Sequence, residues 1–151
     1  MVNSRLLAGG SVAMALAVAL TGVSAAQDAI AQRKAFMKSV GAATKLSNEM
    51  IKGEKPFDAK AAADGMDKIA TGLDGFVKQF PKGTETGGET TVSLKVWEEP
   101  QDFEAKAKAF AATAAKAAAE AGNGADAFKA AFGDVGKSCK GCHEVYRIPK
   151  K

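Results

Sequence analysis

Apolar residues recur at alternating steps of three and four along four separate stretches of the chain. The first stretch covers residues 30–51, the second 62–80, the third 103–121 and the fourth 128–146. An alternation sustained over several turns places the apolar side chains along one side of a helix that packs nearly parallel to its neighbours. The pattern therefore predicts an all-α protein folded as an antiparallel four-helix bundle.

Residues that end or start helices separate these stretches. The segment 52–56, which contains Gly and Pro, is expected to end the first helix, and Asp58 is a suitable N-cap for the second. Residues 81–95 are rich in Gly and Thr, show no helical period, and are long enough to cross the bundle. Pro100 suits the first turn of the third helix, and Asp126 is the expected cap of the fourth. The bundle should thus have one longer crossing loop.

The pentapeptide Cys139-Lys140-Gly141-Cys142-His143 contains both cysteines and the single histidine of the chain. The spacing C-x-x-C-H is the attachment signature of a c-type haem, in which two thiols bind the vinyl groups and the imidazole binds iron. A structural zinc site needs four such ligands, and only three are present. A thioredoxin-like pair would follow a strand, and a disulfide here would close too short a loop to add much stability. We therefore expect one covalent haem c.

Residues 1–25 have the features of a secretory signal peptide. Arg5 precedes an apolar run from residue 6 to 23, and residues 23–26 are small, as a signal peptidase requires. The run is close to membrane-spanning length, but its glycines and the lack of a charged stop favour removal. Residues 26–151 should then form one haem-binding bundle domain in the periplasm, without membrane insertion after cleavage.

Charge and histidine content exclude several other functions. The formal net charge is +4 at pH 7, and so small an excess argues against nucleic acid as a partner. A haem enzyme such as a peroxidase needs a distal acid–base residue, usually a second histidine, which the chain lacks. We expect no catalytic activity.

Two residues of the first helix have alternative roles. Arg33 is a cation at a position that the period assigns to the core. Its charged group either reaches solvent or pairs with a haem propionate. Met37 lies one turn further along the same face. It is either a filler of the core or a soft ligand for the iron.

Five segments make the chain similar to the class II cytochromes c, the family of cytochrome c prime and its six-coordinate, low-spin relatives. They are residues 33–37, 80–85, 96–97, 132–136 and 139–147, and they span the whole region after the signal peptide. The resemblance implies the same four-helix bundle. It also implies that Cys139 and Cys142 carry the thioethers, that His143 is the proximal ligand, and that Arg147 is the arginine of the proximal face.

The resemblance further implies which residues surround the haem on its other side. Arg33 matches the propionate partner, Thr84 and Glu85 match loop residues near the haem edge, and Met37 matches the distal residue. If Met37 binds iron, the protein is a low-spin electron carrier with a periplasmic or membrane-bound redox partner, and residues 41–56 favour this branch. If Met37 only covers the distal face, the protein binds small gases such as nitric oxide.

Family members often pair through their first two helices, so a homodimer is possible here as well. The outward positions of the first helix include Lys34, Lys38, Lys45 and Glu49. Because these side chains are charged, we expect any homodimer to be weak and sensitive to salt.

Overall fold

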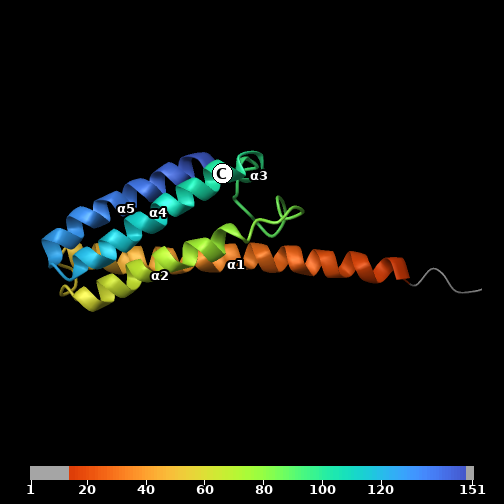
Figure 1. Ribbon diagram of the computed structural model, residues 1–151. Helices are drawn as coiled ribbons and strands as arrows, with labels where there is room; N and C mark the ends of the chain where they lie inside the picture. Colours follow the sequence, from red (N-terminus) through yellow and green to blue (C-terminus); the bar gives the residue numbers. More distant parts are fainter. Residues whose placement is uncertain (1–13, 149–151) are drawn as a thin grey trace, which may run out of the picture.

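The computed structural model describes residues 14–148, and the surroundings of their side chains from residue 26 onward. The four long helices are α1 (Met14–Ile51), α2 (Ala59–Val77), α4 (Pro100–Ala121) and α5 (Ala125–Tyr146). A short helix, α3 (Lys95–Glu98), lies in the connection between α2 and α4. Figure 1 shows α1 beside α2 and α4 beside α5. The predicted bundle is therefore confirmed, with α3 as an addition that the pattern did not indicate.

The core follows the predicted apolar positions closely. In the third stretch, every residue of the three–four alternation that starts at Phe103 and ends at Ala121 is buried. In the second stretch, the same holds from Ala62 to Phe76, and Phe80 is half-buried. Several buried residues of α4 are alanines, which lets α2 and α5 pack closely on either side of it. The buried side chains of α2, α4 and α5 are Ala62, Met66, Ile69, Leu73, Phe76, Phe103, Ala107, Phe110, Ala114, Ala117, Ala118, Ala121, Phe128, Ala131, Phe132, Val135 and Tyr146.

The two helix pairs diverge toward the end of the bundle where α3 lies (Figure 1). Helix α1 packs on α2, α2 on α4 and α4 on α5, whereas α1 and α5 do not share a comparable interface. At the same end α1 continues beyond the bundle. This extension includes residues 14–25 of the predicted signal peptide, and residues 1–13 lie outside the described part of the chain. Within residues 14–148, no helix has both the length and the apolarity to cross a membrane.

Two of the three predicted helix starts are confirmed. Asp58 caps α2, because its Oδ1 accepts a hydrogen bond from the backbone N–H of Ala61 at 2.9 Å. Pro100 is the first residue of α4. The prediction for Asp126 was wrong: α5 is preceded by Gly124, no side chain caps it, and Asp126 lies inside the first turn. Gly124 has φ +100°, a conformation that glycine adopts without strain, and α5 therefore begins two residues earlier than a cap at Asp126 would require.

The crossing connection is tied to the end of α5. Val92 and Arg147 form an isolated antiparallel bridge. On either side of it, Ser93 N–H donates to the carbonyl of Tyr146 at 2.9 Å, and Ile148 N–H donates to the carbonyl of Thr91 at 2.7 Å. The connection therefore lies against the helix that carries the cysteines.

Candidate haem-binding site

Cys139, Cys142 and His143 lie on the last two turns of α5, at the end of the bundle where the helix pairs diverge. A helical spacing of three and four residues brings Cys142 and His143 next to Cys139 on one side of α5. Both cysteines are half-buried against the core and neither forms a disulfide. The side of α5 that they share with His143 is thus suited to holding one planar ligand.

The protonation states of these residues follow from partial burial. Burial raises the pKa of both thiols, and for Cys142 the neighbouring Cys139 raises it further. Burial also lowers the pKa of His143, and the positive charge of Arg147 adds to this effect. The imidazole is therefore neutral around pH 7, which is the form that binds a metal ion. Arg147 is exposed just after α5, and its N–H donates to the carbonyl of His143 at 3.2 Å.

Arg33 is enclosed at the same end of the bundle. It is 4% exposed, and its Nη2 donates to the carbonyl of Thr84 at 2.9 Å. The guanidinium lies over two aromatic rings, 4.7 Å from the centroid of Phe80 and 5.8 Å from that of Trp97. Trp97 is held by a 3.0 Å hydrogen bond from its Nε1 to the carbonyl of Phe80. The alternative in which Arg33 extends into solvent is therefore wrong.

The buried guanidinium lacks enough hydrogen-bond acceptors. Its Nε and Nη1 have no partner among the described residues. Burial lowers the pKa of Arg33, an effect that the charge of Glu85 opposes. Glu85 itself accepts a hydrogen bond from Gly83 N–H at 3.0 Å, and its pKa is lowered first by its own backbone N–H and that of Gly83. Because a buried, unpaired donor is costly, Arg33 is suited to an additional anion such as a haem propionate.

Met37 lies one turn after Arg33 on the same face of α1 and is half-buried against the core. Its neighbour Phe36 stacks on Phe76 of α2, with 4.9 Å between ring centroids. This stacking fixes the rotation of α1 about its axis at this level. Arg33 and Met37 are thereby presented together on one face at the haem end of the bundle.

Two glycines of α5, Gly133 and Gly136, lie before the cysteines at positions where the neighbouring helices leave room for a larger side chain. A Cβ added at Gly133 or Gly136 would meet no atom within 4 Å, and both residues are exposed. Packing among the described residues therefore does not require glycine at either position. A flat ligand lying close to the helix backbone would require it.

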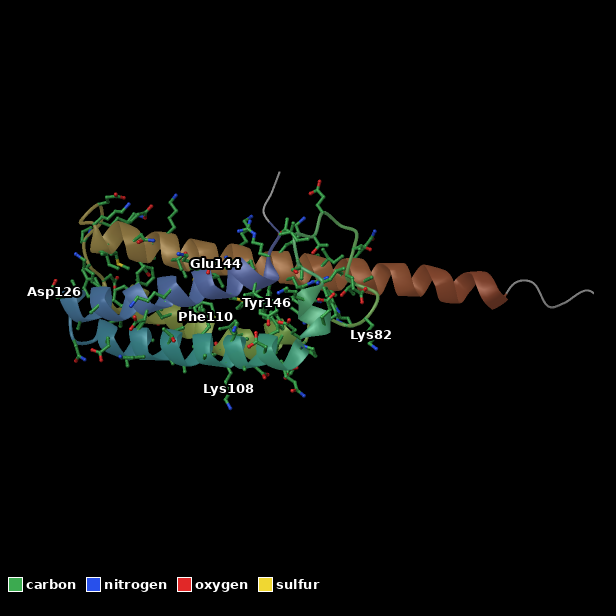
Figure 2. The ribbon with its side chains drawn as sticks, turned by 90° about the horizontal axis from the view of Figure 1, so that it is seen from above. Lys82, Lys108, Phe110, Asp126, Glu144 and Tyr146 are labelled. Carbon is green, nitrogen blue, oxygen red and sulfur yellow. The ribbon has the colours of Figure 1, made fainter. Side chains whose placement is uncertain are left out.

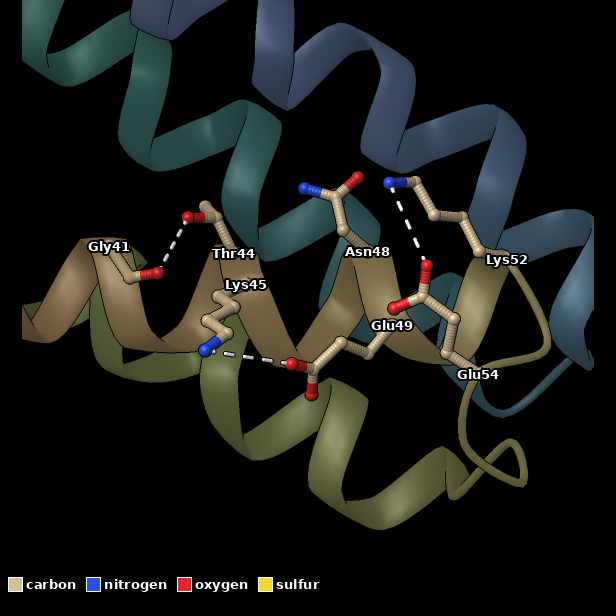
Figure 3. Close-up of a pocket in the computed structure, with 7 residues that line it drawn as sticks. All are labelled: Gly41, Thr44, Lys45, Asn48, Glu49, Lys52 and Glu54. Atoms are coloured by element: carbon tan, nitrogen blue, oxygen red, sulfur yellow. Dashed lines mark hydrogen bonds and ion pairs between the residues drawn. The ribbon is translucent and has the colours of Figure 1, made fainter.

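A groove of about 500 Å³ runs along α1 away from this site (Figure 3). It is lined by Gly41, Thr44, Lys45, Asn48, Glu49, Lys52 and Glu54. Ion pairs cross it, with Lys45 Nζ 3.8 Å from Glu49 Oε1 and Lys52 Nζ 3.9 Å from Glu54 Oε1. None of the predicted site residues lines this groove, and its polar walls do not suit a porphyrin.

Sequence reasoning missed the residues that enclose the site from other elements. Phe80 and Trp97 were known as part of a family motif, but not as the rings beneath Arg33. Nothing in the sequence pattern indicates a role for Asp102, whose carboxylate accepts a hydrogen bond from Tyr146 on α5. An acidic residue in the first turn of a helix is common for reasons of the helix dipole alone, so the sequence offered no signal for this contact.

Comparison with known proteins identifies the class. The sequence profile described as Cytochrome C' matches residues 28–147. Cytochrome c' of Rhodopseudomonas palustris is 38% identical over 138 residues, which cover 89% of this chain and 92% of the relative. Cytochrome c-556 of Agrobacterium tumefaciens is 33% identical over 121 residues, covering 80% and 98%. The solved structure of the Rhodopseudomonas palustris cytochrome c' matches with a TM-score of 0.78 and 35% identity, covering 82% of this chain and 98% of that one.

The helical bundle and the cysteine–histidine motif therefore define a c-type cytochrome of class II. The chain belongs to the cytochrome c' family, whose members bind haem c. The structure is compatible with that cofactor, because three features lie at one end of the bundle: two half-buried thiols, a neutral imidazole, and a buried arginine whose Nε and Nη1 find no acceptor among residues 14–148.

Proposed function

We propose that this protein is a periplasmic electron carrier in which Cys139 and Cys142 attach the haem and His143 and Met37 ligate its iron. One observation supports the choice of Met37: it is half-buried and lies one turn from a buried arginine, two of whose nitrogen atoms have no acceptor in the described part of the chain. A thioether is a soft ligand suited to ferrous iron, and it costs little to desolvate compared with a charged ligand.

Each residue of the proposed site would have one role in holding the haem. His143 would offer a neutral imidazole from α5, and Met37 a thioether from α1. Arg33 would donate its free N–H groups to a propionate, with Phe80 and Trp97 shielding the pair from water. Thr84 and Glu85 would border the haem edge, and Arg147 would lie at the proximal face. When bound, the haem supplies one-electron chemistry, and His/Met ligation favours its ferrous form.

The alternative function is reversible binding of small gases by a five-coordinate iron. It is favoured by the packing of Met37 against the core, which would leave the thioether as a cover of the distal face. Both functions need the same attachment residues. They differ in whether Met37 would occupy the sixth coordination position of the iron. Neither requires a substrate or an acid–base residue, and we therefore propose a carrier rather than an enzyme.

The absorption spectra of ferric and ferrous protein test the proposal directly. We expect wild-type protein to be low-spin in both states and to bind carbon monoxide slowly or poorly. Met37→Ala and the closely isosteric Met37→Leu should become high-spin, bind carbon monoxide readily and show a lower reduction potential. Met50→Leu, which changes a buried methionine further along α1, is the matched control and should remain low-spin. A wild-type protein that is already high-spin in both states would establish the gas-binding function instead.

The cellular location and the partner belong to the same proposal. A signal peptide ending near residue 26 would deliver the chain to the periplasm, where covalent haem attachment takes place. The partner would be a periplasmic or membrane-bound redox protein. Expression of the full chain in a bacterium able to mature c-type cytochromes, followed by fractionation, should give haem-stained protein in the periplasmic fraction and none in the cytoplasm.

A further inference from the structure

The hydroxyl group of Tyr146 donates a short hydrogen bond to the carboxylate of Asp102, with 2.5 Å between Oη and Oδ2. Tyr146 is the last residue of α5 and is 4% exposed, while Asp102 lies in the first turn of α4. Figure 2 shows Tyr146 at the opposite end of α5 from Asp126. The bond therefore joins the cysteine-bearing end of α5 to the start of the neighbouring helix.

Three further contacts hold Tyr146 and Asp102 in place. The Tyr146 ring packs edge-on against Phe103, with 5.1 Å between centroids. Its carbonyl accepts the 2.9 Å hydrogen bond from Ser93 N–H. Lys106 donates to Oδ1 of Asp102 at 3.2 Å, so the carboxylate is held from two sides. Tyr146 thus connects α5 to α4 and to the crossing connection at a single point.

This point lies within one helical turn of the proposed haem ligands. Tyr146 follows His143 by three residues and Cys142 by four, which places it close to both along α5. Asp102 and Lys106 lie near enough to Cys142 for their charges to act on its thiol, in opposite directions. The last turn of a helix frays readily unless side chains hold it, and His143 lies in that turn.

We propose that Tyr146 and Asp102 are positioning residues that fix the last turn of α5 and hold the His143 imidazole in one orientation toward the iron. The inference rests on the proposed role of His143 as the proximal ligand. A hydrogen bond to a carboxylate is stronger than one between neutral groups, and this one is anchored by Lys106. Its loss should free the turn while Cys139, Cys142 and His143 themselves are retained.

Electron paramagnetic resonance of the ferric holoprotein tests this, because the line shape reports the spread of axial-ligand orientations. In Tyr146→Phe, which keeps the ring packing, and in Asp102→Ala, we expect the haem signal to broaden or split. Amide exchange at Ser93 and Arg147 should become about tenfold faster, with α2 unchanged. Asp134→Asn removes an exposed ion pair with Lys137 on the same helix. As the matched control, it should leave the signal unchanged.

The double variant distinguishes a positioning role of the Tyr146–Asp102 hydrogen bond from a general loss of stability of the fold. If the two residues act through one bond, Tyr146→Phe combined with Asp102→Ala should broaden the signal no more than the larger single change. Wild-type line shapes in both single variants, or full additivity in the double one, would overturn the proposal. A high-spin wild type would refute Met37 as a ligand but not this inference, because the rhombic splitting of a high-spin signal also depends on imidazole orientation.

Discussion

The guanidinium group of Arg33 lies over the ring of Phe80, with 4.7 Å between Cζ and the ring centroid. Arg33 comes from α1 and Phe80 from the start of the crossing connection, so two distant segments meet at a buried cation. An aromatic face attracts the charge but offers no acceptor in the plane of the guanidinium, and within the described part of the chain Nε and Nη1 have no hydrogen-bond partner. This geometry explains why Arg33 is suited to a propionate.

Replacing Arg33 should therefore destabilise the haem-loaded protein. We expect Arg33→Met to lower the free energy of unfolding by about 3 kcal/mol, because a propionate bound at Arg33 would be left buried without its partner. Arg33→Lys should restore only part of this loss, since an ammonium group cannot reproduce the fork of donors. Urea unfolding followed by circular dichroism measures both. Lys34→Met, at the exposed neighbouring position, serves as the control and should change stability by less than about 0.5 kcal/mol.

Covalent attachment through Cys139 and Cys142 should be visible in the mass of the exported protein. Protein exported by a bacterium that matures c-type cytochromes should carry one haem that resists acid–acetone extraction, and its chain should begin near Ala26 or Gln27. Mass spectrometry measures both the adduct and the cleavage point. Cys139→Ser and Cys142→Ser together should abolish the adduct. Free thiols in the exported wild-type protein would contradict covalent attachment.

Alanine substitutions at two glycines of α2, Gly72 and Gly75, should change the stability of the fold in opposite directions. A Cβ at Gly72 would lie 2.4 Å from Cε2 of Phe36, whereas one at Gly75 would meet nothing within 4 Å. Gly75→Ala should stabilise the fold by about 0.5–1 kcal/mol through helix propensity. Gly72→Ala should be less stable than Gly75→Ala by about 1–3 kcal/mol, because Phe36 must move from its stacking position. Thermal unfolding distinguishes the two, and equal gains would refute the close contact.

The stability provided by Asp102 should depend on pH. Hydrogen bonds from Tyr146 and then Lys106 lower the pKa of this carboxyl below its ordinary value. A lowered pKa in the folded state stabilises the fold above the ordinary aspartate pKa of about 3.9, and this contribution is lost as the pH falls through the folded-state value. The difference in melting temperature between wild type and Asp102→Asn should therefore shrink from about pH 7 to about pH 3. In a Tyr146→Phe background the same comparison should show a weaker pH dependence.

Self-association through α1 should be weak. Lys45 and Lys55 both pair with Glu49, at 3.8 and 2.8 Å, and Lys34 lies 3.8 Å from Glu89. A partner copy would have to compete with these contacts and with the solvation of the charges. Sedimentation at several protein concentrations should show a dimer fraction that changes with salt. A dimer that persists at high salt and high dilution would contradict the prediction.

Local chemistry explains how far the sequence could predict the structure. Ile30, Val40 and Ser47 are buried as their period indicates, because a helix repeats its faces regardless of what covers them. Asp58 caps α2 because a cap depends on a few neighbouring residues. The same reasoning failed for Asp126, where a glycine with positive φ made the turn instead.

The sequence by itself thus determined the four long helices, their apolar faces, and the motif that identifies a haem protein. Only the tertiary structure decided how the remaining site residues are held. Arg33 meets the carbonyl of Thr84 across 51 residues, and Tyr146 meets Asp102 across 44. Such contacts exist because packing of the bundle brings segments that are distant in the chain together, and no periodicity or spacing along the chain encodes them. The position of the Arg33 guanidinium over Phe80 and the hydrogen bond between Tyr146 and Asp102 follow from that packing.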